Sequence, residues 1–242
     1  MQSRVNGINI NFEIDGLDNA PWLILSNSLL TNLSMWDDQV ATLARSFRIL
    51  RYDQRGHGDT EATAGDYSFD LLVADIIALI DMLGIGRAHF CGLSMGGMTA
   101  LFLAQRHPQR FDRIIACDCG PASTEASAQQ WKERIEVASR DGMQALVEPT
   151  IARWFPPDFV ATKAPVLDKV RGMIRSTPLA GFRGCAMALS NYDLRGGLAG
   201  IRQIKEAVRG SALVELEGAG HISNVEQPAA FTGAVVDFLS QA

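Results

Sequence analysis

Short apolar runs alternate with amphipathic segments of helical period along the first 118 residues. The chain opens with alternating polar and apolar residues around Asn6-Gly7, the signature of a β-hairpin. A strand–helix alternation then predicts a mostly parallel sheet wrapped by helices on both faces, the architecture of the α/β class. The expected strands are 21–27, 47–53, 88–93 and 113–118, and the expected helices between them are 35–45, 72–83 and 95–107.

Composition excludes several other classes. The chain has 242 residues, of which 47% are hydrophobic and 20% charged. One domain with an insertion can therefore bury a sufficient core without disulfides or a structural metal. A net charge of −5 argues against nucleic acid as a partner. No apolar run has the roughly 18 residues of a membrane span, and no secretory signal is visible. We therefore expect a cytoplasmic protein with reduced cysteines and no metal site.

The pattern changes after residue 122. Helical stretches interrupted by prolines and without a clear strand run from 123 to 191, which indicates a helical insertion, or lid. The α/β core is then expected to comprise 1–122 and 192–242. Its second part should contain a helix with Ile201, Ile204 and Val208, a strand at 212–216 and a final helix at 227–239.

The sharpest motif is Gly92-Leu93-Ser94-Met95-Gly96, which lies between a predicted strand and a predicted helix. This is the context of the G-x-S-x-G nucleophile turn, where glycines permit a tight bend that exposes the serine. Ser94 is the predicted nucleophile. The Met95 backbone N–H is one predicted oxyanion donor, and the second is expected from Leu29, in the loop after the strand that ends near Asn27.

A serine nucleophile needs a base, and the chain offers four histidines. His221 follows the last predicted strand in a glycine-containing loop and comes after Ser94 in the chain, as in sheet hydrolases. His221 is therefore the predicted base. The others have structural interpretations: His89 lies within a strand, His107 ends a helix, and His57 lies in the loop Arg55-Gly56-His57-Gly58.

These residues resemble the α/β-hydrolases, and more narrowly the 3-oxoadipate enol-lactone hydrolases of aromatic degradation. The Asn27-Ser28 pair replaces the His-Gly of most α/β-hydrolases and points to this branch, although Leu30 stands where the branch has glycine. The segments that carry the resemblance are Leu25–Leu29 with Ser34–Asp37, Leu50–Gly58, His89–Met98, Arg153–Phe155, Asp193–Arg195 and Gly220–Pro228.

The resemblance also implies a further strand and an acidic residue between the lid and the last helix–strand pair, yet about 20 residues that would carry them are missing. Between Asp193 and Ser211 there is no run of four consecutive apolar residues. Three alternatives remain for the acid. Asp118, at the end of a predicted strand, can serve; Asp193, 28 residues before His221, can serve; or the acid is absent.

The resemblance implies a small lactone substrate that bears a carboxylate, and no metal or organic cofactor. The lid arginines Arg134, Arg153 and Arg183 are candidates for binding the carboxylate, with Arg134 preferred, and Trp154 for the pocket wall. Binding partners are thus expected to be a small lactone or ester, with no membrane and an undetermined oligomeric state. Three alternatives remain open. The substrate can be another small carboxylic ester, the reaction can be that of a perhydrolase without cofactor, or the chain can be a binding protein that has lost turnover.

Overall fold

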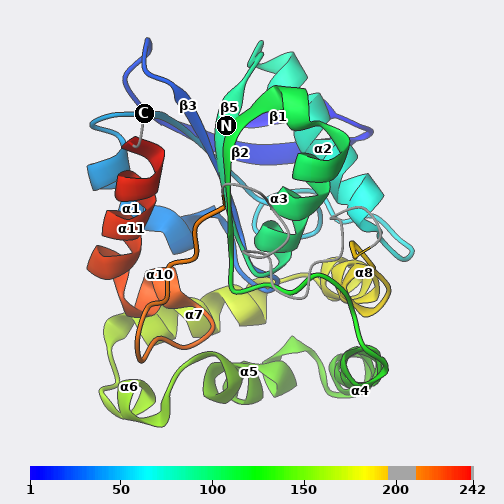
Figure 1. Cartoon of the computed structure of the whole chain (residues 1–242). Helices are drawn as coiled ribbons and strands as arrows, with labels where there is room; N and C mark the ends of the chain where they lie inside the picture. Colours follow the sequence, from blue (N-terminus) through cyan, green and yellow to red (C-terminus); the bar gives the residue numbers. More distant parts are fainter. Residues whose placement is uncertain (196–210, 241–242) are drawn as a thin grey trace.

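A single mixed sheet organises the chain (Figure 1). The computed structural model describes residues 1–195 and 211–240. The sheet order is β1-β2-β4-β3-β5-β6, with β3 to β6 mutually parallel and β2 antiparallel to both neighbours. The strands are β1 (Gln2–Val5), β2 (Ile8–Gly16), β3 (Trp22–Ser26), β4 (Arg48–Tyr52), β5 (Ala88–Leu93) and β6 (Phe111–Cys117). The predicted α/β class and the predicted hairpin are confirmed; Asn6 and Gly7 both have the positive φ of a tight hairpin turn.

Helices cover both faces of this sheet. Figure 1 shows α1 and α11 together on one face and α2 and α3 on the other. Helix α2 begins where the Ser68 side chain accepts the Leu71 N–H, and ends before Gly84, which has φ 69°. The helical elements are η1 (Leu33–Trp36), α1 (Asp37–Leu43), α2 (Phe69–Met82), α3 (Met95–Arg106), η2 (Pro108–Arg110) and α11 (Pro228–Ser240).

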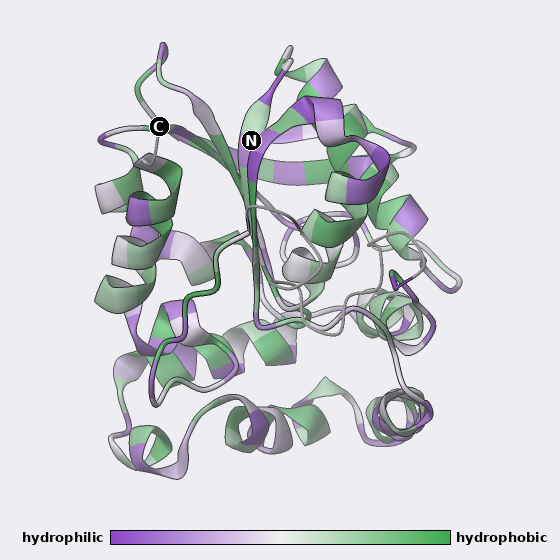
Figure 2. Cartoon of the chain, in the orientation of Figure 1, coloured by the Kyte–Doolittle hydropathy of each residue, from purple (hydrophilic) through white to green (hydrophobic). Residues whose placement is uncertain are grey.

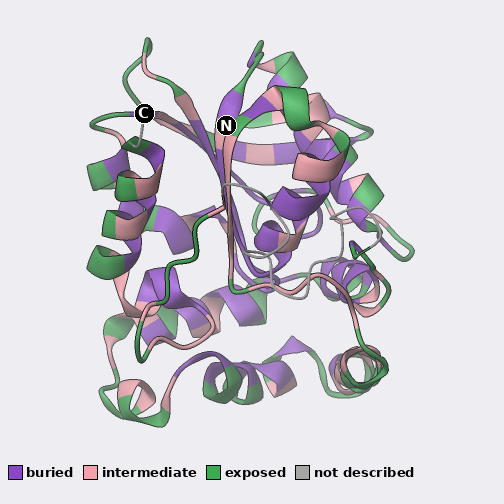
Figure 3. Cartoon of the chain, viewed as in Figure 1, coloured by how far each residue is buried: buried purple, intermediate pink, exposed green. Residues whose placement is uncertain are grey.

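The core lies on both faces of the central strands. Leu23, Ile24 and Leu25 are successive residues of β3, and all three are fully buried. A strand buried on both sides reads as a continuous apolar run, which is why 21–27 could be predicted. Figures 2 and 3 show the same arrangement: the sheet interior is hydrophobic and buried, while polar, exposed residues lie on the outer sides of the helices.

The segment after β6 is helical, as predicted, and lies across one end of the sheet (Figure 1). It leaves and rejoins the core at one place, because Ala122 and Asp193 form an antiparallel bridge. The division into a core and a lid at 122 and 192 stays a prediction. The elements are α4 (Glu125–Asp141), η3 (Met143–Leu146), α5 (Val147–Trp154), α6 (Pro157–Ala161), α7 (Pro165–Ser176) and α8 (Leu179–Ser190).

One strand prediction is wrong. Residues 212–216 form no strand with any residue that the structure describes, and Leu213 and Val214 are exposed. The local sequence has β-strand character, but a strand also needs a neighbour to bond to, and β6 ends the described sheet. The predicted helix with Ile201, Ile204 and Val208 lies outside the described residues. The short helix α10 (Ser223–Glu226) follows His221.

Across residues 1–195 and 211–240, none of the helices combines the length and the apolar character that crossing a bilayer requires.

Candidate active site

Ser94 lies at a sharp turn between β5 and α3, as predicted. Its backbone has φ 56° and ψ −112°, a conformation that costs free energy and is held by the surrounding close packing. A Cβ on Gly92 would lie 2.0 Å from the Gly96 carbonyl oxygen, and one on Gly96 would lie 2.2 Å from the Ser26 carbonyl oxygen. The two glycines are therefore required by space, and the turn presents the Ser94 hydroxyl above the carboxyl ends of the strands.

His221 is brought to this serine from a loop 127 residues away in the chain. Its Nε2 lies 2.9 Å from Ser94 Oγ, so the structure brings the predicted base and the predicted nucleophile together. Burial lowers the pKa of His221 to about 4, with further lowering from the charges of Arg153 and Arg134. The ring is thus neutral near pH 7. In the tautomer with hydrogen on Nδ1, Nε2 can accept the Ser94 proton.

The other three histidines have structural roles. His107 is the C-cap residue of α3, and His89 packs edge-on against Phe47. His57 is fully buried, and its Nδ1 lies 3.2 Å from the Arg55 carbonyl oxygen. Burial lowers the pKa of His57 to about 4. These placements agree with the structural interpretations of the sequence.

The first-choice acid, Asp118, does not make the contact expected of it. Its Oδ2 accepts a hydrogen bond of 2.7 Å from Ser223 Oγ, and the Ser223 backbone also donates to it. Within the described part of the chain, no carboxylate is hydrogen-bonded to His221 Nδ1, and no carboxylate raises the pKa of His221. The Asp118 carboxylate instead accepts from the hydroxyl and the backbone N–H of Ser223, two residues after the base. Ser223 was not anticipated, although its position near His221 was a signal.

The second-choice acid, Asp193, is engaged elsewhere. Its carboxylate is exposed and forms an ion pair of 2.6 Å with Arg195, which lowers the pKa of Asp193 to about 2. The segment 196–210, in which the resemblance places the missing strand and acid, lies outside the described residues.

The predicted oxyanion loop is tightly organised around Asn27. The Asn27 amide donates to the Tyr52 carbonyl, its Oδ1 accepts from Trp36 Nε1 at 2.9 Å, and its backbone carbonyl accepts from the Gly96 N–H at 3.0 Å. Leu30 has φ 64°, the left-handed backbone that favours glycine, at the position where glycine was expected.

The two predicted oxyanion donors belong to this organised region. Met95 is the first residue of α3, where a backbone N–H has no partner within the helix, and Leu29 is buried in the loop that follows β3. Their action on an oxyanion stays a prediction.

Lid residues approach the base. The Trp154 ring lies 6.3 Å from the His221 ring, and the Trp154 carbonyl accepts the His221 N–H at 2.7 Å. Trp154 is buried, and its role in the wall of a substrate pocket stays a prediction.

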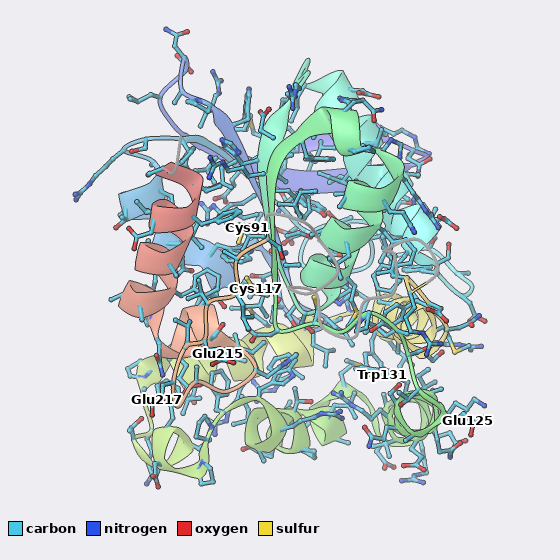
Figure 4. All side chains as sticks on the ribbon, viewed as in Figure 1. Cys91, Cys117, Glu125, Trp131, Glu215 and Glu217 are labelled. Atoms are coloured by element: carbon cyan, nitrogen blue, oxygen red, sulfur yellow. The ribbon has the colours of Figure 1, made fainter. Side chains whose placement is uncertain are left out.

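Arg134 is the arginine that the lid encloses. Its guanidinium lies 4.9 Å from the Trp131 ring centroid and 5.9 Å from that of Phe182, and its Nη2 donates to Thr150 Oγ1 at 2.8 Å. Figure 4 labels Trp131 on α4. Burial, followed by the charge of Arg153, lowers the pKa of Arg134 to about 10. It therefore remains a cation at neutral pH.

The remaining lid arginines differ from Arg134. Arg153 is exposed and donates to Gln130 at 3.0 Å, but its charge still reaches His221. Arg183 is exposed and lies 3.9 Å from Asp66. None of the described ion pairs involves Arg134 or Arg153, and the charges of both arginines lower the pKa of His221. In the same ranges, no group of three or more His, Cys, Asp or Glu could hold a metal ion.

Comparisons with known proteins agree with this geometry. The family model described as "alpha/beta hydrolase fold" matches residues 21–176. The chain is 34% identical to 3-oxoadipate enol-lactonase 2 of Acinetobacter baylyi, over 93% of this chain and 91% of that protein. It is 27% identical to a putative carbamate hydrolase, RutD, of Pseudomonas savastanoi pv. phaseolicola, over 91% of this chain and 94% of that protein.

A solved structure, the enol-lactonase from Burkholderia xenovorans LB400, has a TM-score of 0.95 and 39% identity, with 100% of both chains covered. The turn between β5 and α3 presents Ser94 to a neutral His221, and the family model covers most of the sheet. The chain belongs to the α/β-hydrolase family.

Proposed function

We propose that this hydrolase opens the ring of a small lactone that bears a carboxylate, with 3-oxoadipate enol-lactone as the substrate in aromatic catabolism. The observation that carries the proposal is the combination of a Ser94–His221 pair at 2.9 Å with an enclosed, unpaired arginine, Arg134, whose charge reaches the base. Relatives named as enol-lactonases, at 34% and 39% identity, support the choice of lactone.

The reaction begins at Ser94. His221 Nε2 takes the hydroxyl proton as Ser94 Oγ attacks the lactone carbonyl carbon. The backbone N–H groups of Met95 and Leu29 stabilise the oxyanion of the tetrahedral intermediate. The ring oxygen then leaves as the enol, with the proton returned by His221, and an acyl group remains on Ser94. Water activated by His221 attacks this ester, and Ser94 Oγ leaves and takes a proton back from His221. The released enol tautomerises to 3-oxoadipate.

Arg134 is the proposed anchor for the substrate carboxylate. A guanidinium has five N–H donors in a planar fork that suits a carboxylate, and the described residues use one of them, for Thr150. The rings of Trp131 and Phe182 limit the positions open to the guanidinium. A net charge of −5 opposes the approach of an anion, so a local cation is needed to bind it.

The test compares two substrates. The parent should hydrolyse 3-oxoadipate enol-lactone with a higher kcat/KM than 4-nitrophenyl acetate, an ester without a carboxylate. Arg134→Met should lower kcat/KM for the lactone about 10- to 100-fold, since a hydrogen-bonded charge contributes about 1.5–3 kcal/mol, and should change the aryl ester much less.

The matched control is Arg183→Met, because Arg183 is an exposed lid arginine with its own partner, and it should leave both substrates unchanged. If Arg134→Met lowers kcat/KM equally for both substrates, Arg134 does not bind the substrate carboxylate. A preference for simple esters or for an alkyl carbamate, the bond class suggested by the RutD relatives' name, would replace the lactone as substrate.

A further inference from the structure

Three hydrogen bonds close to His221 hold the loop that carries the base, in addition to those that Asn224 of α10 makes with Met35 and Gln39. The His221 N–H donates to the Trp154 carbonyl at 2.7 Å, and the Gly220 N–H donates to Glu226 Oε2 at 2.6 Å. The third tie is the hydrogen bond of 2.7 Å from Ser223 Oγ to Asp118 Oδ2. The first tie joins the loop to α5, the second joins it to α10, and the third joins α10 to Asp118, the residue that follows β6.

The strand end at the third tie also fixes the nucleophile. The carbonyl of Cys117, the last residue of β6, accepts the Ser94 N–H at 2.9 Å. Asp118 follows directly and turns with φ 51°, a left-handed backbone that a non-glycine residue adopts at a cost. Two adjacent residues therefore hold the two halves of the catalytic pair: Cys117 holds Ser94, and Asp118 holds the loop of His221.

Ser223 depends on this carboxylate. Ser223 is 4% exposed, so loss of the acceptor would leave a buried hydroxyl and a backbone N–H without their bonds. A buried donor without a partner costs more than the bond contributes, and the loop would shift to find water. Because reacting atoms must be held close to their productive geometry, a shift of about 1 Å can cost about 10²-fold in rate.

We propose that Asp118 is a positioning residue: it fixes His221 against Ser94 by accepting the hydrogen bonds of Ser223, and it does not contact the imidazole itself. The proposal rests on the proposed function, since it assigns a role within the Ser94–His221 reaction. It replaces the triad-acid role that the sequence predicted for Asp118.

Asparagine distinguishes the two roles. The Asn side chain keeps an oxygen that can accept from Ser223, so Asp118→Asn should retain activity within about 10-fold of the parent if Asp118 only positions the loop. If Asp118 were the triad acid, the same change would remove the charge that orients the imidazole, at a cost of about 10⁴-fold. Asp118→Leu and Ser223→Ala remove the acceptor and the donor respectively.

The experiment measures kcat, KM and the pH profile for 4-nitrophenyl acetate in the full chain, together with the rate of Ser94 labelling by a fluorophosphonate. Asp118→Leu and Ser223→Ala should each lower kcat and the labelling rate about 10- to 100-fold, with KM changed less than about two-fold. The double variant should be no worse than the poorer single variant, because both changes remove one interaction. Asp193→Asn, an exposed aspartate paired with Arg195, is the matched control.

Three results overturn the proposal. If Asp118→Asn loses as much activity as Asp118→Leu, the charge acts directly. If Ser223→Ala keeps the parent activity while both Asp118 variants lose it, Ser223 is not the link. If Asp118→Leu and Ser223→Ala both keep full kcat, the tie has no role. Variants are compared only after circular dichroism shows a folded protein, and Ser223→Ala and Asp118→Asn change few atoms. An inactive, unlabelled parent would instead refute the proposed function on which the proposal rests.

Discussion

His57 makes a prediction about stability that does not depend on the substrate. The side chain is fully buried, and its pKa of about 4 lies below the ordinary histidine value of 6.5 because of burial. A histidine whose pKa is lowered by folding binds protons more readily when unfolded. His57 therefore does not lower the free energy of unfolding above pH 6.5, and it lowers it progressively as the pH falls from 6.5 toward 4.

The magnitude follows from the shift. One pKa unit corresponds to about 1.4 kcal/mol, so the shift of His57 should lower the free energy of unfolding by about 2 kcal/mol between pH 7 and pH 5. His221, whose pKa is also lowered to about 4, should contribute a similar loss. His57→Gln places a neutral amide in the same space and should remove the first contribution, which is about half of the combined loss.

The assay is urea unfolding followed by tryptophan fluorescence at pH 7, 6 and 5, for the parent and His57→Gln. The absolute stability of the variant is not the readout, because the substitution also changes packing; the readout is the difference in free energy between pH values. The same pH dependence in both proteins would show that His57 is not a buried neutral histidine.

Three further changes have expected outcomes. Arg134→Met should raise the pKa of His221, because the charge of Arg134 lowers that pKa. The acidic limb of the pH profile of kcat/KM should therefore move to higher pH. An unmoved limb would mean that the charge of Arg134 does not reach the base. Gly96→Ala should lower the free energy of unfolding in urea by about 3 kcal/mol, because its Cβ would meet the Ser26 carbonyl oxygen. Gly172→Ala, at an open position in a helix, should be neutral or stabilising. Equal effects of the two changes would refute the packing argument. Leu30→Gly should relieve about 1 kcal/mol of left-handed backbone strain, but it should also lose about 2–5 kcal/mol of stabilisation from burying the Leu30 side chain. The melting temperature should therefore fall, and a rise would contradict this balance.

The sequence predicted most successfully where the signal was local. The strand, glycines and helix around Ser94 are contiguous, and the same bend that requires Gly92 and Gly96 presents the Ser94 hydroxyl to His221. His221 could be selected because only four histidines exist and its loop follows the last part of the core. The doubly buried β3 could be recognised from its apolar run.

The remainder depends on contacts that no local pattern encodes. The hydrogen bond from Ser223 to Asp118 joins α10 to the residue that follows β6, and these two side chains meet only in the folded chain. The residues 212–216 have the composition of a strand but find no partner among the described residues. The enclosure of Arg134 by Trp131 and Phe182 joins α4 to α8, a contact between segments about 50 residues apart along the chain.

The central claim is that Ser94 and His221 open a lactone ring. The most direct measurement follows the loss of 3-oxoadipate enol-lactone and the formation of 3-oxoadipate by the purified parent and by Ser94→Ala. We predict turnover by the parent and a loss of kcat of up to about 10⁶-fold in Ser94→Ala, because the nucleophile and its base act as one unit. Turnover that survives Ser94→Ala would contradict the account.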